Sequence, residues 1–256
     1  RRLDISIKED LIEEVGRIYG YEHVQGTLPV LESKEGSYSK KELFIKGLRQ
    51  RLQGLGLTEV ITYSLVKKED VSKYTNFQNE DIVLLDPLTE DRKYLRKSLI
   101  PSLLNVWEYN TSRNQKNVAI YESGNIYYKE QDEYVERPMI SGLLYGIGTN
   151  NLWQQEKIVV DFYYVKGIIE NIMKYLGLNN RYSFDTKNLP KEFHPGRSCA
   201  LLIDRVVVGY FGQVHPTECK KEVYVFELDV LKIMSHKVRM MKYKEISKYP
   251  AIHKDL

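Results

Sequence analysis

The sequence predicts an α+β fold in which an antiparallel β-sheet is flanked by helices. Segments rich in β-branched and aromatic residues follow one another closely enough to pair as hairpins, and amphipathic segments of helical period are interspersed among them. Strands and helices do not alternate regularly, as they would in a parallel βαβ architecture. The 256 residues are enough to bury a substantial core.

The first predicted helix begins near Ile7 or Lys8. Ser6 with Glu9 three residues later has the form of a capping box, which satisfies backbone donors at a helix start. Residues 26–38 follow as a predicted linker, because glycine and proline interrupt them and they have little periodicity.

A second helix is predicted over residues 39–54, followed by a strand at 58–65 and a short strand at 82–85. Another helix should begin at Ile100, with Pro101 in its first turn, where its missing N–H does no harm. The side chains expected to form the apolar stripes of these two helices are Leu43, Phe44, Leu48, Leu52, Leu55, Leu103, Leu104 and Trp107.

Two strands are predicted at residues 117–128 and 139–147, separated by a charged loop. An amphipathic helix should then cover residues 162–176. The remaining elements are a hairpin at 198–214 that turns near Asp204 and Arg205, a strand at 223–228 and a short helix ending at Ile233.

Composition excludes several classes of protein. The net charge of +3, with 29% charged residues, describes a mixed surface rather than one that binds polyanions. Cys199 and Cys219 match no zinc or redox spacing, which indicates a reduced, cytoplasmic protein. No apolar run approaches a membrane span, and no signal peptide is visible. Because the chain begins at Arg1 and stops at Leu256 within a motif, we expect a piece of a longer protein.

Four carboxylates gather around the first helix. Asp10, Glu13 and Glu14 have the spacing i, i+3 and i+4, which places them on adjoining parts of one face, and Asp4 precedes the helix on a segment that can fold back. Repulsion among them calls for a counter-charge, which Mg²⁺ would supply. The alternative is an acidic helix start that complements the helix dipole, with Glu13 paired to Arg17; spacing alone favours this second interpretation.

The opening of the chain resembles the β subunit of bacterial phenylalanine–tRNA ligase. The resemblance lies in Arg1-Arg2-Leu3-Asp4-Ile5 and in the run from Glu9 to Tyr21. It implies that this stretch closes a winged-helix-like domain and that Asp4, Asp10, Glu13 and Glu14 are ligands of a Mg²⁺ ion shared with the α subunit. With the resemblance included, the metal interpretation is favoured.

Further motifs extend the resemblance almost to the end of the chain. They are Asp86-Pro87-Leu88-Thr89-Glu90-Asp91, the run from Leu95 to Leu104, Tyr109-Asn110, Arg113, Ile120-Tyr121-Glu122-Ser123-Gly124, the run from Asp161 to Gly167, Phe193-His194-Pro195-Gly196-Arg197-Ser198, the run from Gly212 to Pro216, and Tyr249-Pro250-Ala251-Ile252. These motifs imply the noncatalytic class II aminoacyl-tRNA synthetase-like core of the β subunit.

The resemblance also implies a domain organisation. Residues 1–25 would end the metal-site domain, 26–38 would be the linker, 39–242 the synthetase-like core, and 243–256 the start of a linker to an anticodon-binding domain. An editing domain would lie upstream. The partners implied are the α subunit in an α₂β₂ enzyme and tRNA(Phe), which is bound mainly by domains outside this chain.

The core is predicted to lack catalytic residues. Class II synthetases hold ATP with an arginine two residues before a glutamate, because arginine can contact phosphate with two parallel bonds. Glu122 would occupy the glutamate position here, but the residue two before it is Ile120, and no arginine follows the glycines of 142–148. ATP would therefore be used by the α subunit and not bound by this chain, which alone should be inactive.

His194-Pro195-Gly196-Arg197 could suggest acid–base chemistry or phosphate binding. No nucleophile lies nearby in the sequence, so we favour a structural loop that enters the hairpin, with Arg197 paired to a carboxylate.

Two alternative functions remain beside the β-subunit role. The first is a free-standing class II synthetase paralogue, disfavoured by Ile120. The second is a winged-helix nucleic-acid-binding module, disfavoured because the retained helix is acidic.

Overall fold

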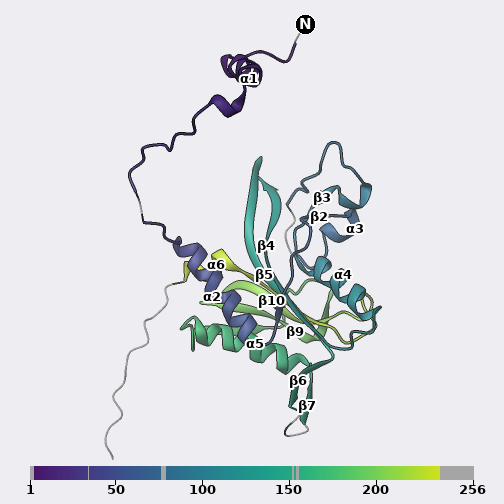
Figure 1. Cartoon of the computed structure of the whole chain (residues 1–256). Helices are drawn as coiled ribbons and strands as arrows, with labels where there is room; N and C mark the ends of the chain where they lie inside the picture. The colour runs from purple at the N-terminus through teal and green to yellow at the C-terminus, as the bar shows by residue number, and fades with distance from the viewer. Residues whose placement is uncertain (1–2, 34, 76–78, 152, 154–155, 237–256) are drawn as a thin grey trace, which may run out of the picture. The chain divides into compact units, whose positions relative to one another are not determined.

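In the computed structural model, the chain forms two compact units, Arg1–Ser37 and Tyr38–Leu256. Figure 1 follows the whole chain from its N-terminus to its C-terminus. The structure describes residues 3–33, 35–75, 79–151, 153 and 156–236. The motif Tyr249-Pro250-Ala251-Ile252, the end of the predicted core and the predicted second linker therefore lie outside the described residues.

The first unit contains the helix α1 (Lys8–Tyr19) and a 3₁₀ turn, η1 (Tyr21–His23). The predicted helix start is confirmed, but the predicted capping residues are wrong. Ile7 is the last extended residue, so the third helical position falls on Asp10 instead of Glu9. The Asp10 carboxylate accepts hydrogen bonds from the backbone N–H groups of Ser6 and Ile7, at 2.8 and 2.9 Å.

The second unit is built on a seven-stranded sheet, and its α+β class confirms the prediction. The strand order is β1 (Thr58–Glu59), β4 (Val118–Glu130), β5 (Glu133–Tyr145), β11 (Tyr224–Asp229), β10 (Val206–Val214), β9 (Phe193–Ile203), β8 (Tyr182–Asp185). All neighbours are antiparallel except β1 and β4, which pair in parallel at one edge.

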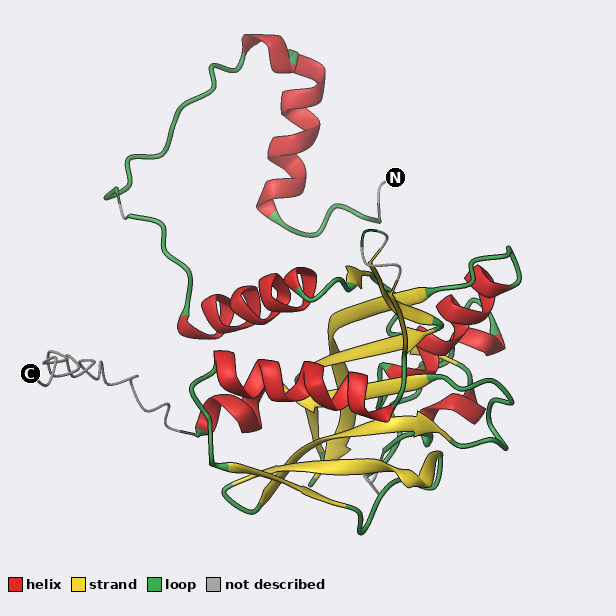
Figure 2. Ribbon diagram, turned by 90° about the horizontal axis from the view of Figure 1, so that it is seen from below, coloured by secondary structure: helices red, strands yellow, loops and turns green. Residues whose placement is uncertain are grey.

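Helices cover both faces of this sheet. On one face, α2 (Lys40–Gly54), α5 (Phe162–Tyr175) and α6 (Val230–Ser235) bury the larger apolar core, and Figure 2 shows α2 and α5 running side by side across the strands. On the other face, α4 (Ile100–Thr111) buries Leu103 and Trp107 as predicted. The single turn α3 (Lys68–Val71) also lies in this unit.

The predicted strand at 58–65 is interrupted. Only Thr58–Glu59 joins the main sheet as β1, and β2 (Leu65–Val66) pairs separately with β3 (Tyr94–Leu95), which follows the 3₁₀ turn η2 (Glu90–Arg92). The chain leaves the sheet because Thr62 turns toward a buried carboxylate, as described below. The predicted strand at 82–85 is reduced to an isolated bridge between Val83 and Tyr94.

The hairpins show which turns the local sequence predicts correctly and which it does not. The predicted turn at Asp204 and Arg205 is confirmed, since both residues have positive φ angles between β9 and β10. The predicted charged loop between two strands is wrong. Gln131 and Asp132 make a tight turn instead, and the charged residues continue the β4–β5 hairpin to the Glu130–Glu133 pair. The hairpin of β6 (Ile147–Asn151) and β7 (Glu156–Val159) was not predicted.

Candidate functional site

The four predicted metal ligands lie in the first unit, on and just before α1. Asp4 and Glu13 are exposed, and Asp10 and Glu14 are half-buried. Hydrogen bonds from the backbone N–H groups of Ile7 and Ser6 hold the pKa of Asp10 below its ordinary value. Glu14 pairs with Arg17 at 2.8 Å, where Glu13 had been the predicted partner.

The chemistry of this donor set fits a hard dication, because all four side chains offer carboxylate oxygens. Two of them also have contacts within their own helix: Asp10 caps it, and Glu14 is paired with Arg17. Among the residues that the structure describes, no three acidic, histidine or cysteine side chains form a group that could hold a metal ion. The ligand set therefore stays a prediction.

The predicted position of a class II ATP site, at Ile120 and Glu122, lies in the second unit on β4. Ile120 is only 7% exposed and packs in the core beneath α4. Glu122 is also buried, and its carboxylate faces the guanidinium of Arg96 at 2.9 Å. The Thr62 hydroxyl donates to the same carboxylate at 2.7 Å.

Arg96 completes a closed polar cluster around Glu122. Its Nε donates to the backbone carbonyl of Asn125 and its Nη1 to the hydroxyl of Thr62. Charged hydrogen bonds of this kind satisfy a buried ion pair and leave Glu122 engaged within the protein. Arg96 lies in the family motif from Leu95 to Leu104, but its pairing with Glu122 was not predicted, because the two residues are 26 positions apart in the sequence.

Two of the glycines of 142–148 make room for aromatic rings. A Cβ at Gly142 would come within 2.3 Å of the ring of Phe226 on the neighbouring strand, and one at Gly148 within 2.5 Å of Tyr164. Close approach of a bulky neighbour is a standard reason for glycine in a strand. These two glycines therefore have a packing explanation that needs no phosphate group.

The motif from His194 to Arg197 also has a structural explanation, although its predicted position is wrong. It lies inside β9, where the register with β10 shifts between Gly212 and Val214, and not in a loop before the hairpin. Arg197 pairs with the carboxylate of Glu222 at 2.9 Å, as the structural interpretation expected. His194 accepts a hydrogen bond from the backbone N–H of Gly196.

A groove of about 740 Å³ runs beside α4 on the second unit. Three of its lining residues expose large side chains: Ile61 is 92% exposed, Tyr63 67% and Tyr109 59%. Arg92 stacks over the ring of Tyr63, with its guanidinium carbon 3.9 Å from the ring centre. Aromatic residues and arginine are enriched at protein–protein interfaces, so this groove is a candidate interaction surface.

The sequence matches the family model described as the phenylalanyl tRNA synthetase beta chain CLM domain over residues 24–230. Similar curated proteins are named phenylalanine–tRNA ligase beta subunit. They include those of Geobacillus kaustophilus, 37% identical over 262 residues, Halalkalibacterium halodurans, 38% over 267, and Staphylococcus aureus, 39% over 266. Each alignment covers 100% of this chain but only 32%, 33% and 32% of the relative, so the chain spans about a third of their length.

Solved structures agree with the fold. Two structures of pyrrolysyl-tRNA synthetase from Desulfitobacterium hafniense align with a TM-score of 0.55 each, at 15% and 12% identity. They cover 75% and 88% of this chain, and the chain covers 66% and 74% of theirs. Such distant likeness supports the class II synthetase architecture and no particular chemistry. No helix in the described part of the chain is long and apolar enough to span a membrane.

Proposed function

The chain belongs to the phenylalanyl-tRNA synthetase β-chain family, and we propose that it serves as a noncatalytic scaffold in an ATP-dependent phenylalanine–tRNA ligase. In this proposal it packs against the catalytic α subunit of a cytoplasmic α₂β₂ enzyme. The α subunit uses ATP, and tRNA(Phe) is bound mainly by other parts of the ligase. The observation that carries the noncatalytic role is the cluster on β4, where Ile120 is buried in the core and Glu122 is already paired with Arg96.

The same cluster disfavours a free-standing synthetase. A triphosphate needs exposed cations, whereas Arg96 has only 4% of its side chain exposed and both its charge and its donors are directed to Glu122, Thr62 and Asn125. A nucleic-acid-binding role is disfavoured by α1, which has the acidic residues Asp10, Glu13 and Glu14 where a recognition helix would need cations.

The groove beside α4 supports the scaffold role, and we assign it as a contact surface for the α subunit. Ile61, Tyr63 and Tyr109 expose large apolar and aromatic side chains at the groove, and Arg92 adds a cation stacked on Tyr63. Burying such residues in a partner would remove apolar surface from water, which is the main driving force of stable association.

The scaffold role is tested by mixing the purified chain with the α subunit and measuring the mass of the complex by light scattering. We expect a stable complex from the wild-type chain. Tyr63→Ala should weaken it about tenfold or more, because a buried tyrosine at an interface commonly contributes over 1.4 kcal/mol.

The matched control is Tyr134→Ala, which removes another exposed tyrosine, 75% exposed on the β4–β5 hairpin. It should leave the affinity unchanged. Equal affinities for the two variants would contradict the assigned surface, and a wild-type chain that forms no complex would contradict a scaffold role for this part of the β subunit.

For the metal, we propose that Asp4, Asp10, Glu13 and Glu14 contribute ligands to a Mg²⁺ ion that the α subunit also helps to hold. Mg²⁺ commonly binds through one or two carboxylates and keeps several waters, so a site divided between two chains suits its chemistry. Its role in the proposal is to neutralise the carboxylates around α1 and to connect the two subunits there.

Glu13→Gln combined with Glu14→Gln should lower the Mg²⁺ content of the assembled enzyme, measured by elemental analysis after gel filtration, and leave the circular dichroism of the chain unchanged. The control is Glu9→Gln with Glu22→Gln, which removes the same charge from positions outside the proposed set. Unchanged Mg²⁺ content in the first double variant would exclude the ligand assignment.

A further inference from the structure

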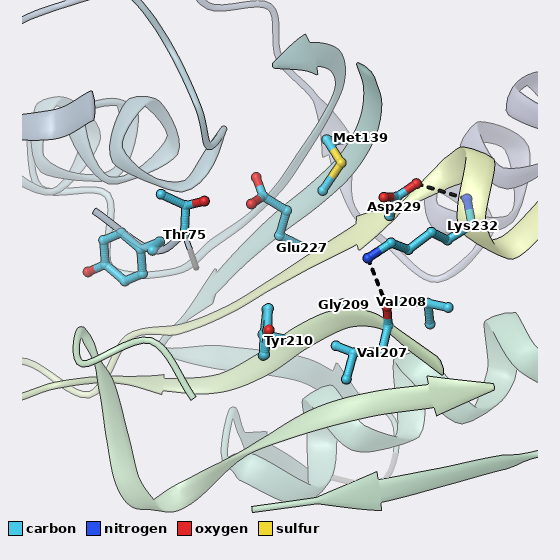
Figure 3. Close-up of a pocket in the computed structure, with 10 residues that line it drawn as sticks. Thr75, Met139, Val207, Val208, Gly209, Tyr210, Glu227, Asp229 and Lys232 are labelled. Atoms are coloured by element: carbon cyan, nitrogen blue, oxygen red, sulfur yellow. Dashed lines mark hydrogen bonds between the residues drawn. The ribbon is translucent and has the colours of Figure 1, made fainter. Parts of the chain in front are cut away.

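A cavity of about 170 Å³ lies in the second unit, beside the strands β5, β10 and β11 and the helix α6 (Figure 3). Its walls include apolar side chains, among them Met139 and Val207, and three charged ones, Glu227, Asp229 and Lys232. An apolar cavity of about 150 Å³ is known to accept benzene, so this space suits an organic molecule of similar size.

A β-bulge shapes one wall of the cavity. The register between β10 and β9 passes from Val207–Leu202 directly to Gly209–Leu201, which leaves Val208 as an extra residue. Bulges bend a strand and redirect its side chains, and they occur often beside binding sites. At this bulge the carbonyl of Val207 accepts a hydrogen bond from the ammonium group of Lys232, at 3.2 Å.

Glu227 has an unused oxygen in this cavity. The residue is only 6% exposed, and Figure 3 shows its carboxyl group between Thr75 and Met139. Its Oε1 accepts hydrogen bonds from the backbone N–H of Leu99 at 2.7 Å and from the hydroxyl of Ser98 at 3.2 Å. No hydrogen bond from the described residues reaches Oε2. An ionised carboxylate has acceptor capacity on both oxygens, so an oxygen that faces a cavity and receives no donor from the protein can accept one from a ligand.

The other charged groups of the cavity are engaged within the protein. Asp229 accepts from the backbone N–H of Lys232 at 2.9 Å and forms an ion pair with Arg137, so both of its oxygens have partners. Lys232 is held by the carbonyl of Val207. Of the described charged groups lining the cavity, Glu227 therefore has the acceptor capacity that a ligand could use.

We propose that this cavity binds a small organic ligand with a primary ammonium group on an apolar body. The ammonium donates to Oε2 of Glu227, and the apolar body lies against Met139 and Val207. A charged hydrogen bond is stronger than a neutral one, which gives selectivity for amines over alcohols of the same shape. This inference is independent of the scaffold role and of the α-subunit contact.

The proposal implies a pH dependence. Burial raises the pKa of Glu227 to about 7, against the opposing effect of the hydrogen bond from Leu99. Of the charged groups around it, Arg96 lowers this pKa and Glu122 raises it, while Asp229 and Lys232 line the same cavity. Because an ammonium ligand binds the ionised carboxylate, affinity should rise as the pH increases from about 6 to about 8 and Glu227 loses its proton.

The test uses benzylamine and its neutral analogue benzyl alcohol, titrated into the whole chain and followed by amide chemical shifts. We expect benzylamine to shift the signals of Val207, Gly209 and Glu227 and to bind about tenfold or more tightly than benzyl alcohol at pH 8. Equal affinities, an affinity for benzylamine that does not change with pH, or the absence of shifts at these residues would each overturn the proposal.

Two variants separate the site from a general effect on folding. Glu227→Gln keeps the shape but removes the charge, so it should abolish both the preference for benzylamine and its pH dependence. Lys232→Met removes a like charge beside the ligand and should tighten benzylamine binding severalfold, while Lys187→Met, at an exposed position, serves as its control. If Glu227→Gln does not fold, an unchanged affinity in Lys232→Met would overturn the proposal.

Discussion

Arg96 and Glu122 form a buried ion pair at the glutamate of the predicted ATP position. Their side chains are 4% and 3% exposed, and Thr62 and Asn125 complete their hydrogen bonds. Such a pair contributes little net stability compared with apolar residues, but breaking it leaves a buried charge without compensation. Its function in this chain is therefore to hold three segments together: the segment after β1, the segment between β3 and α4, and the strand β4.

Arg96→Met should destabilise the chain by about 3–5 kcal/mol, because it leaves the Glu122 carboxylate buried and unpaired. Urea unfolding followed by circular dichroism measures this loss. Arg49→Met is the control, since Arg49 is 47% exposed in its ion pair with Glu59 and an exposed pair contributes about 0–1 kcal/mol. If the two variants are equally stable, the buried pair does not have the structural role described here.

At the scale of elements, the predicted parts of the fold are those that local sequence determines. The helix α5 has its apolar stripe and an Asp161 side chain that caps it, and the turn at Asp204–Arg205 lies between two clear strands. The break between β1 and β2 was not predictable, because it depends on Thr62 meeting Glu122, 60 residues away. The charged end of the β4–β5 hairpin looked like a loop since its side chains are exposed on both sides.

The residues of the candidate sites also divide into those that the sequence identifies and those that only the folded structure brings together. Ile120 and Glu122 were identified from the sequence because a family motif fixes their spacing. Arg96 and Glu227 were not, because only the assembled sheet brings Arg96 to β4 and leaves Glu227 beside a cavity. A glutamate in the middle of the apolar run from Val223 to Leu228 was the one local signal for the second.

The contact between Gly142 on β5 and Phe226 on β11 gives a test of how these two neighbouring strands pack. Gly142→Ala should destabilise the chain by about 1–3 kcal/mol, because the added Cβ would come within 2.3 Å of the Phe226 ring. Gly167→Ala is the control. Gly167 is exposed within α5 and has no neighbour within 4 Å of an added Cβ, so that substitution should stabilise the helix by about 0.5–1 kcal/mol.

Thermal and urea unfolding of both glycine variants measure the difference. Phe226→Leu in the Gly142→Ala background should recover part of the loss, since the smaller side chain relieves the contact. If Gly142→Ala is as stable as the wild type, the glycine is not there to accommodate the ring, and an explanation in terms of a bound group would regain support.

At the scale of the whole molecule, the fold is that of a class II synthetase, and the proposed noncatalytic role rests on how the residues at the predicted ATP position are buried. The sheet and the helices on both of its faces are held together by three clusters of buried apolar residues. The same burial that stabilises this architecture also fills the position where an ATP-binding arginine would stand. We therefore expect that one added cation would not create an ATP site, because the Glu122 carboxylate is already paired with Arg96.

Ile120→Arg tests this conclusion. Ile120 belongs to the buried apolar cluster that also contains Leu103, Leu143 and Val225, so a guanidinium there would be buried without a partner. We expect a loss of about 3–5 kcal/mol in the free energy of unfolding and no ATP–pyrophosphate exchange from the isolated chain. Ile120→Met, which keeps an apolar side chain of similar volume, should cost less than about 1.5 kcal/mol. Exchange activity in the arginine variant would mean that the ATP site is intact apart from one residue, and the scaffold role would then describe only part of what this chain does.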